Sequence, residues 1–258
     1  MSIPKIIHYC WFGDGPISPE SRKCMESWKK YCPDYKIMAW NEQNFDISAN
    51  RYAQQAYAAK KYAFVSDYAR LAVLYEYGGI YLDTDVELVR PLDELLEHKG
   101  FIGMEHSMPT PYGRTLLVNT GSGVGAEPGC EMIGKMLASY RNAAFVQETG
   151  EPDLRTCTQR DTPLFTKAGL QQKNEQQELD GFLVLPTDCF SPFDYVTERM
   201  HRTPRTFGIH YYHGSWQSGD KANRWRKRFK CTKVGRWCMW LRQCLPRWLR
   251  EKRRSLHN

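Results

Sequence analysis

The sequence has no run of eighteen apolar residues, the length that would indicate a membrane-spanning helix. Its first residues, MSIPKIIHYCWFG, lack the apolar core of a signal peptide, because their short apolar run contains His8. The nine cysteines form no C-x-x-C pair, so we expect reduced thiols and neither a disulfide framework nor a zinc ribbon. Internal repeats and low-complexity linkers are also missing. We therefore expect a globular, cytoplasmic protein.

Acidic residues are scarce at one end of the chain. The 258 residues carry a formal net charge of +7. Residues 221–258 hold 14 Lys or Arg and one acid, Glu251, so the remaining 220 residues carry a net charge of −6. This asymmetry predicts a mildly acidic body with a basic tail that meets an anionic partner, either a membrane or a nucleic acid.

Apolar strands alternate with helical patterns along the body, which predicts an α/β domain with a largely parallel sheet. The expected strands are 3–12, 36–40, 79–83, 100–105, 182–186 and 206–216. One helix is expected over 18–31, with Ser18 as its N-cap. Another is expected over 52–77, with a break near 60–65 and with Gly78 as the residue that ends it.

Two carboxylates, Asp83 and Asp85, stand at the end of a strand, where ligands of parallel sheets bind. In extended chain, alternate side chains point the same way, so both project to one side. Close carboxylates repel each other unless a cation lies beside them, and oxygen ligands of this kind suit Mg²⁺ or Mn²⁺. Such an ion would neutralise a departing nucleoside diphosphate. The alternative is a turn with two solvated acids, because a lone D-x-D is short and common.

Asp67 and Arg70 are three residues apart and share one helix face. A guanidinium beside a carboxylate can clamp a hydroxyl or a phosphate, and the alternative is a surface ion pair that contributes little. His210 and His213 face opposite sides of a strand, and we favour His210 as the one that reaches the metal. A zinc site built from both is disfavoured, since no Cys or Glu lies nearby at ligand spacing.

Three ordered motifs resemble glycosyltransferase family 32. They are IPKIIHYCWFG (3–13), the stretch 66–85 with SDYAR and GGIYLDTD, and IHYYHGSW (209–216). That family includes yeast-type mannosyltransferases and bacterial capsular-polysaccharide transferases, and the large clostridial glucosylating toxins look like distant relatives through the second motif. The likeness covers residues 3–216.

This resemblance implies a GT-A fold, which is an α/β fold with a mixed, mostly parallel sheet. It also implies a nucleotide-sugar donor with a preference for UDP-sugars, Mn²⁺ or Mg²⁺ as cofactor, and transfer with retention of anomeric configuration. We expect the catalytic domain over 1–219 and the basic, tryptophan-rich tail over 220–258.

The resemblance implies roles for individual residues as well. The implied catalytic residues are Asp67, Arg70, Asp83, Asp85 and Asn119. The implied donor-binding residues are Trp11, Asp67, Arg70, Asp83, Ser215 and Trp216. The implied metal ligands are Asp83, Asp85 and His210. Trp11 would stack on the base, Asn119 would face the sugar, and Ser215 and Trp216 would close over the diphosphate.

The chain departs from the family at Asp161, in TQRDTPLFT, where the family often has Thr-Gly-Pro. The sequence also shows no nucleophile for a double displacement, because Glu87 and Asp93 near the D-x-D are more typical of solvated acids. We therefore expect front-side attack, in which the acceptor hydroxyl gives its proton to the leaving phosphate.

Apolar residues recur at helical spacing in the tail, which predicts a basic amphipathic helix. They are Trp237, Trp240, Leu241, Cys244, Leu245, Trp248 and Leu249. Tryptophan beside arginine suits the headgroup region of an anionic leaflet, so we expect membrane association through 221–258. The alternatives are a helix that packs on the body and a nucleic-acid-binding segment.

Taken together, these patterns predict a metal-dependent retaining glycosyltransferase, peripheral on the inner face of a bacterial plasma membrane. Its acceptor would be a glycan or a lipid-linked oligosaccharide in polysaccharide or lipopolysaccharide biosynthesis, and no nucleic-acid partner is expected. One alternative is a non-catalytic nucleic-acid- or membrane-binding protein that uses the basic tail. Another is a nucleotide-sugar hydrolase that uses the same metal.

Overall fold

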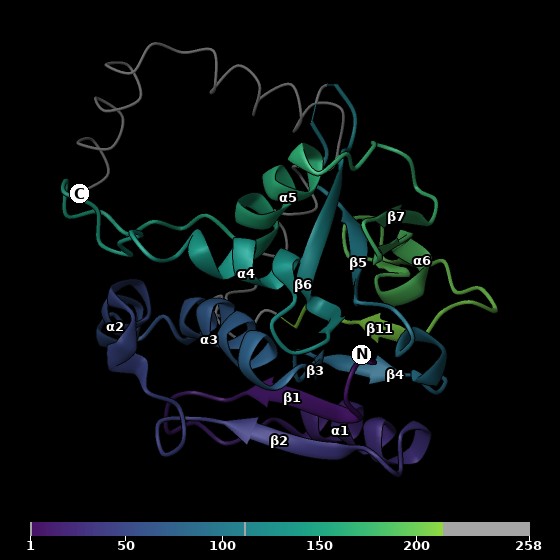
Figure 1. Cartoon of the computed structure of the whole chain (residues 1–258), viewed down its shortest axis with the longest axis horizontal. Helices are drawn as coiled ribbons and strands as arrows, with labels where there is room; N and C mark the ends of the chain where they lie inside the picture. Colours follow the sequence, from purple (N-terminus) through teal and green to yellow (C-terminus); the bar gives the residue numbers. More distant parts are fainter. Residues whose placement is uncertain (1, 111, 214–258) are drawn as a thin grey trace.

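The computed structural model of the chain describes residues 2–110 and 112–213. Its centre is a seven-stranded sheet in the order β2-β1-β3-β6-β5-β8-β7 (Figure 1). These strands are β1 (Ile6–Cys10), β2 (Lys36–Trp40), β3 (Gly79–Tyr81), β5 (Gly100–His106), β6 (Leu116–Ala126), β7 (Gln177–Leu179) and β8 (Phe182–Leu185). Two further pairs are β4 (Val86–Leu88) with β11 (Gly208–His210) and β9 (Phe193–Asp194) with β10 (Arg199–Met200).

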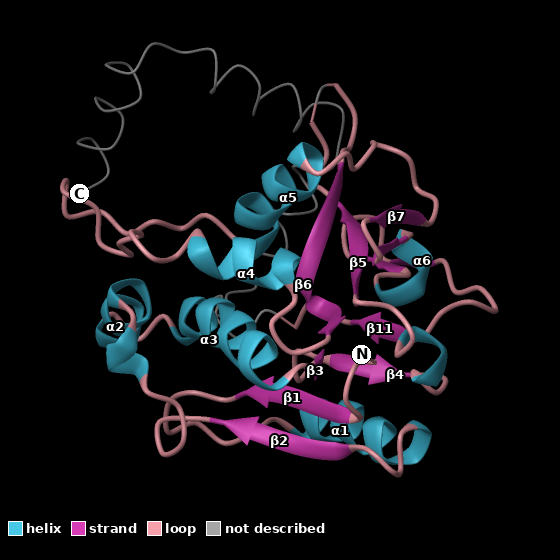
Figure 2. Cartoon of the chain, viewed as in Figure 1, coloured by secondary structure: helices cyan, strands magenta, loops and turns pink. Residues whose placement is uncertain are grey.

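Helices lie on both faces of the sheet (Figure 2). They are α1 (Pro19–Tyr31), α2 (Arg51–Ala58), α3 (Tyr62–Tyr77), α4 (Glu131–Ala138), α5 (Cys157–Lys167) and α6 (Thr187–Phe190), with two short 3₁₀ turns at Ile47–Ala49 and Asp93–Leu95. Five strands of the large sheet run in one direction, and only β6 and β7 run against them. The predicted fold class, α/β with a mixed and mostly parallel sheet, is confirmed.

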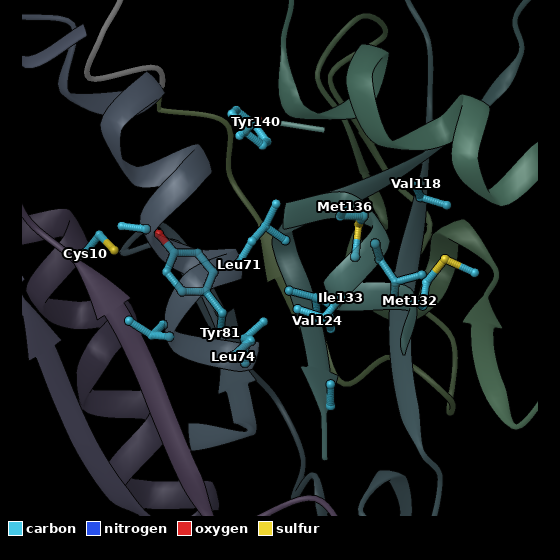
Figure 3. Close-up of a cluster of buried hydrophobic side chains, with 14 of the residues drawn as sticks. Cys10, Leu71, Leu74, Tyr81, Val118, Val124, Met132, Ile133, Met136 and Tyr140 are labelled. Atoms are coloured by element: carbon cyan, nitrogen blue, oxygen red, sulfur yellow. The ribbon is translucent and has the colours of Figure 1, made fainter. Parts of the chain in front are cut away.

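Two apolar clusters hold the layers together, one on each face of the sheet. The first joins α2, α3, α4 and α5 to the sheet, and Figure 3 shows members of it from β1, α3, β3, β6 and α4. The second joins α1 and α6 to the opposite face and includes the fully buried Trp28. The indole of Trp28 donates a hydrogen bond to the carbonyl of Val86 at 2.7 Å, so even this core residue leaves no polar atom unpaired.

Local signals in the sequence fix the two predicted helices. The Ser18 hydroxyl accepts a hydrogen bond from the Ser21 N–H, as an N-cap does. The predicted break in the second helical stretch is confirmed, because Lys60 has a φ of 55° between α2 and α3. Gly78 and Gly79, with φ of 64° and 97°, then turn the chain from α3 directly into β3. This turn leads the chain to the two aspartates.

His8 is a structural residue inside β1. Its side chain is fully buried, Nε2 donates to the Gly78 carbonyl at 2.8 Å, and Nδ1 accepts from the indole of Trp40 at 3.0 Å. Burial lowers the pKa of His8 to about 4, so the imidazole is neutral near pH 7. It therefore ties the end of α3 and strand β2 to β1 without adding charge to the core.

The sequence analysis did not predict β6, although it is the longest strand described, nor α4 or α5. Three glycines alternate along β6, and glycine has a poor β propensity. The structure shows why they are there. A Cβ on Gly123 would lie 2.6 Å from the Phe190 ring, and one on Gly125 would lie 2.4 Å from the Phe101 ring. Glycine lets two aromatic rings pack directly on the strand.

The predicted C-terminal helix, Ser215 and Trp216 lie outside the described residues. Within the described ranges, none of the helices combines the length and the apolar character that crossing a membrane requires.

Replacing Gly123 with alanine tests the packing on β6. Because the new methyl group would overlap the Phe190 ring, we expect Gly123→Ala to lower the free energy of unfolding by ~1–3 kcal/mol in urea titrations. Gly15→Ala is the control, since a Cβ there meets nothing within 4 Å, and it should change stability by less than ~0.5 kcal/mol. Equal stability of the two variants would contradict this account.

Candidate active site

Asp83, Asp85 and His210 form one cluster, whose ligand atoms all lie within 4.8 Å of one another. Asp83 lies two residues beyond β3, and its N–H donates to the Gly121 carbonyl of β6 at 2.9 Å. The expectation of an extended D-x-D is wrong, because Thr84 and Asp85 form a turn in which the Val86 N–H donates to the Asp83 carbonyl at 3.0 Å. His210 comes from β11, which pairs with β4 so that His210 lies opposite Val86. The sequence places this histidine 125 positions after Asp85, and strand pairing brings the two together.

Asp85 and His210 hold each other in charged form. His210 Nε2 lies 3.3 Å from Asp85 Oδ1, and the His213 N–H donates to Asp85 Oδ2 at 2.8 Å. Burial disfavours charge on both groups, but their attraction outweighs it. The pKa of Asp85 therefore lies below its usual range and the pKa of His210 lies above its own. Cation binding would replace the proton between them.

The donor set fits a divalent cation. Two carboxylates and an imidazole converge, and His210 Nδ1 is a buried atom without a hydrogen-bond partner in the part of the chain described. Carboxylates suit Mg²⁺ and Mn²⁺, while an imidazole ligand favours a first-row transition metal. The set therefore fits Mn²⁺ better than Mg²⁺. Of the two predicted histidines, His210 is the one whose ring reaches the carboxylates.

Arg70 joins the metal cluster to helix α3. Its guanidinium is buried and bonds Asp83 Oδ1 at 3.1 Å, Asp67 Oδ1 at 3.0 Å and the Thr120 hydroxyl at 3.1 Å. The guanidinium also lies over the Tyr81 ring, 4.8 Å from its centroid. The Tyr81 hydroxyl donates to Asp83 Oδ1 at 3.0 Å. Asp67 and Arg70 are therefore not a surface ion pair but the buried anchor of Asp83.

Two further acids of this region carry raised pKa values. Burial raises the pKa of Asp67 to about 6, in part offset by Arg70. Burial and the neighbouring Asp67 charge raise the pKa of Asp161 to about 8. Asp161 lies on α5, is fully buried, and neither of its oxygens has a hydrogen-bond partner within the described ranges. Asp161, at which the chain departs from the family pattern, thus lies close to Asp67.

Asn119 belongs to a second polar group, which sequence analysis only half identified. Its side-chain amide donates to Glu105 Oε2 at 2.7 Å, and its Oδ1 accepts from the Gly121 N–H at 2.7 Å. The Tyr212 hydroxyl donates to the same Glu105 oxygen at 2.9 Å. Sequence analysis missed Glu105. The signal was present, because an acid inside the otherwise apolar stretch GFIGMEH of β5 is out of place in a buried strand.

Trp11 lies just beyond β1, at the same edge of the sheet as Asp83, because β1 and β3 are parallel neighbours. Its N–H donates to the Trp40 carbonyl and its indole donates to the Gly15 carbonyl at 2.7 Å, which leaves the ring half-buried. The placement is compatible with the predicted stacking on a base.

Part of the candidate site lies in a stretch of sequence that matches a known family model. Residues 18–102 match the family model of the glycosyltransferase sugar-binding region containing a DXD motif. The match includes Asp67, Arg70, Asp83 and Asp85. The resemblance is confirmed over this stretch, which contains the second of the three motifs.

Two curated relatives align with part of this chain. The chain is 32% identical over 112 residues to inositol phosphoceramide mannosyltransferase 3 of Schizosaccharomyces pombe, and 30% identical over 111 residues to inositol phosphoceramide mannosyltransferase 1 of the same yeast. Each alignment covers 39% of this chain. The chain spans only 29% and 33% of the length of these two proteins.

Solved structures with a related backbone include the PaToxG glycosyltransferase, at a TM-score of 0.45 and 23% identity over 65% of this chain and 72% of that one. Another is a glycosyltransferase involved in glycosylation of the major capsid of PBCV-1. It has a TM-score of 0.44 and 13% identity over 86% of this chain and 98% of the other. At scores below 0.5 neither structure bears on the roles of individual residues.

Gly121→Ala tests whether the close approach of β6 sets the Asp83 carboxylate. A Cβ at this position would lie 2.1 Å from Asp83 Oδ2, so the carboxylate would have to move off its cluster. We expect Mn²⁺ affinity, measured by calorimetry, to fall at least ~10-fold. Gly15→Ala should bind Mn²⁺ as the unaltered protein does. Unchanged affinity in Gly121→Ala would show that Asp83 is not positioned by this strand.

Asp161→Asn tests the raised pKa of Asp161 through the pH dependence of the free energy of unfolding. A folded-state pKa of about 8, far above the unfolded value, makes the acid increasingly destabilising as pH rises from 4 to 8. We expect Asp161→Asn to gain unfolding free energy relative to the unaltered protein by up to ~1.4 kcal/mol per pH unit across that window. Asp180→Asn, at a side chain that is 91% exposed, should give a flat difference. A flat difference for Asp161→Asn would contradict the raised pKa.

Proposed function

We propose that this chain is a metal-dependent glycosyltransferase that moves a sugar from a nucleotide-sugar to a glycan acceptor. One observation carries the proposal. The D-x-D carboxylates and His210 form a cation site, and the buried Arg70 links that site to Asp67 within 3.1 Å contacts. A cation site beside a cationic clamp is what a nucleoside diphosphate with an attached sugar requires.

Each residue of the site has a proposed role that follows from its position. Asp83, Asp85 and His210 hold the cation, which when bound neutralises the charge that develops on the leaving diphosphate. Arg70 supplies a fixed positive charge and orients Asp67 toward the donor sugar. Asn119, held by Glu105 and by the Gly121 N–H, faces the sugar from β6. Because these groups are already hydrogen-bonded, little reorganisation is needed when the donor binds.

The donor, the stereochemistry and the acceptor are finer parts of the proposal. We propose a UDP-sugar, retention of configuration, and a lipid-linked acceptor in bacterial polysaccharide or lipopolysaccharide synthesis, at the inner face of the plasma membrane. The two yeast relatives are, by name, mannosyltransferases of inositol phosphoceramide, a lipid, which supports a lipid-linked acceptor. The basic composition of 221–258 supports an anionic membrane surface as partner.

A hydrolase with the same metal site would bind the same nucleotides but would release the sugar to water. Turnover of a UDP-sugar that does not respond to any glycan acceptor favours the hydrolase. A non-catalytic role of the tail would give salt-dependent binding to duplex DNA or to vesicles without nucleotide binding.

Calorimetry with UDP, with and without Mn²⁺, tests the donor site. We expect binding that requires the ion, that is weaker with Mg²⁺, and that falls at least ~100-fold in Asp85→Ala because a direct ligand is lost. Glu178→Gln, at an exposed side chain of β7, is the control and should bind normally. Binding of GDP in place of UDP would support the transferase proposal but with guanine as the base of the donor. Failure of both nucleotides in the unaltered protein would refute the proposal.

A further inference from the structure

A retaining transfer by double displacement needs a carboxylate with a free oxygen on the side of the sugar away from the diphosphate. Most acids of the site are committed elsewhere. Asp83 and Asp85 belong to the cation cluster, Asp67 is bonded to Arg70, and Asp161 is enclosed with no exposed surface. Glu105 is the remaining acid of the two polar groups described above.

Glu105 is fixed through one oxygen and open at the other. Oε2 accepts hydrogen bonds from the Asn119 amide at 2.7 Å and from the Tyr212 hydroxyl at 2.9 Å. Oε1 accepts no hydrogen bond from the described residues, and it is not among their enclosed unpaired atoms. The residue keeps 8% of its surface exposed. Two donors on one oxygen therefore aim the second oxygen without occupying it.

The position of Glu105 relative to the cation cluster follows from three contacts. The Tyr212 ring, which bonds Glu105, lies 4.0 Å from the His210 imidazole, centroid to centroid. Glu105 lies on β5 and Asn119 on the adjacent β6, on the same face of the sheet. Asn119, which the resemblance implies faces the sugar, is bonded to Glu105, so a sugar in contact with Asn119 would lie beside the Glu105 carboxylate.

We propose that Glu105 is the catalytic nucleophile of this enzyme and that transfer proceeds through a glycosyl ester on its Oε1. The inference rests on the proposed function, including retention, and replaces the front-side path expected from the sequence. It is a role for a residue outside the D-x-D region that residues 18–102 define.

The two steps balance as follows. In the first, Oε1 forms a bond to the anomeric carbon, the bond from that carbon to the diphosphate oxygen breaks, and its electron pair leaves with the nucleoside diphosphate. In the second, the acceptor hydroxyl oxygen bonds to the anomeric carbon, the ester bond breaks, and its electron pair returns to Oε1. The hydroxyl proton passes to the departed diphosphate or to water. Two inversions give retention.

The environment of Glu105 suits both steps. Burial raises the pKa of this carboxyl above its usual range, and a more basic carboxylate is the better nucleophile. The Asn119 and Tyr212 donors on Oε2 stabilise the carboxylate as it leaves in the second step. Tyr212 is also only two residues from His210, so the segment that completes the cation cluster positions the nucleophile as well.

Glu105→Gln is the decisive variant, because the glutamine carbonyl can accept the same two hydrogen bonds but cannot form the ester. We expect kcat to fall at least ~1,000-fold while Mn²⁺-dependent UDP affinity, measured by calorimetry, stays within ~2-fold. Glu178→Gln, at an exposed side chain of β7, is the control, with full activity expected. In Glu105→Ala, added azide should restore turnover and yield a glycosyl azide of configuration opposite to the donor. The intact mass of the unaltered enzyme with donor alone should increase by one glycosyl group, and peptide mapping should place that adduct on the peptide that contains Glu105.

Three results would overturn this assignment: activity of Glu105→Gln within ~10-fold of normal, inversion by the unaltered enzyme, or azide products that retain the donor configuration. The first would leave Glu105 a positioning residue for Asn119. If any of these results is found while the variants still bind UDP normally, only the assignment of Glu105 as nucleophile is refuted. Absence of UDP and GDP binding in the unaltered protein refutes the proposed function together with it.

Discussion

The site depends on a single buried cation, the guanidinium of Arg70. It contacts Asp67 on its own helix, Asp83 after β3 and Thr120 on β6, so it joins three segments that meet only in the folded chain. A buried charge of this kind is costly unless it is paired, and pairing with one acid alone would leave donors unused. The acids on either side and the Tyr81 ring beneath it offset that cost. As a result Asp83 is held in place before any cation arrives.

Asp85 has a different anchor, and the difference is functional. Its partners are the His210 imidazole at the end of β11 and the His213 N–H three residues later. Arg70 keeps its charge at any physiological pH, whereas a metal ion bound at the cluster would take the place of the proton on His210. The cluster would then have one side of permanent charge, at Arg70, and one exchangeable side, at His210. Strand pairing between β11 and β4 is what brings the exchangeable side into reach.

Local chemistry explains which parts of this architecture the sequence could predict. Ser18, Gly78 and the D-x-D act through neighbours a few residues away, so the α1 cap, the end of α3 and the carboxylate pair were all predictable. The strand β6 was not, because its glycines make sense only when the Phe101 and Phe190 rings are seen against them. Glu105 was not either, since its partners lie 14 and 107 positions away. The tail lies outside the described residues, so its amphipathic helix stays a prediction.

Charge decides the order in which ligands can enter. Within the cluster, the carboxylates of Asp83 and Asp85 stand beside the imidazole of His210. A nucleoside diphosphate approaching these two carboxylates without a cation would meet their repulsion at short range. A divalent ion held by this cluster would reverse the sign of the local field that the diphosphate meets. The carboxylates would then suit the diphosphate only through the ion.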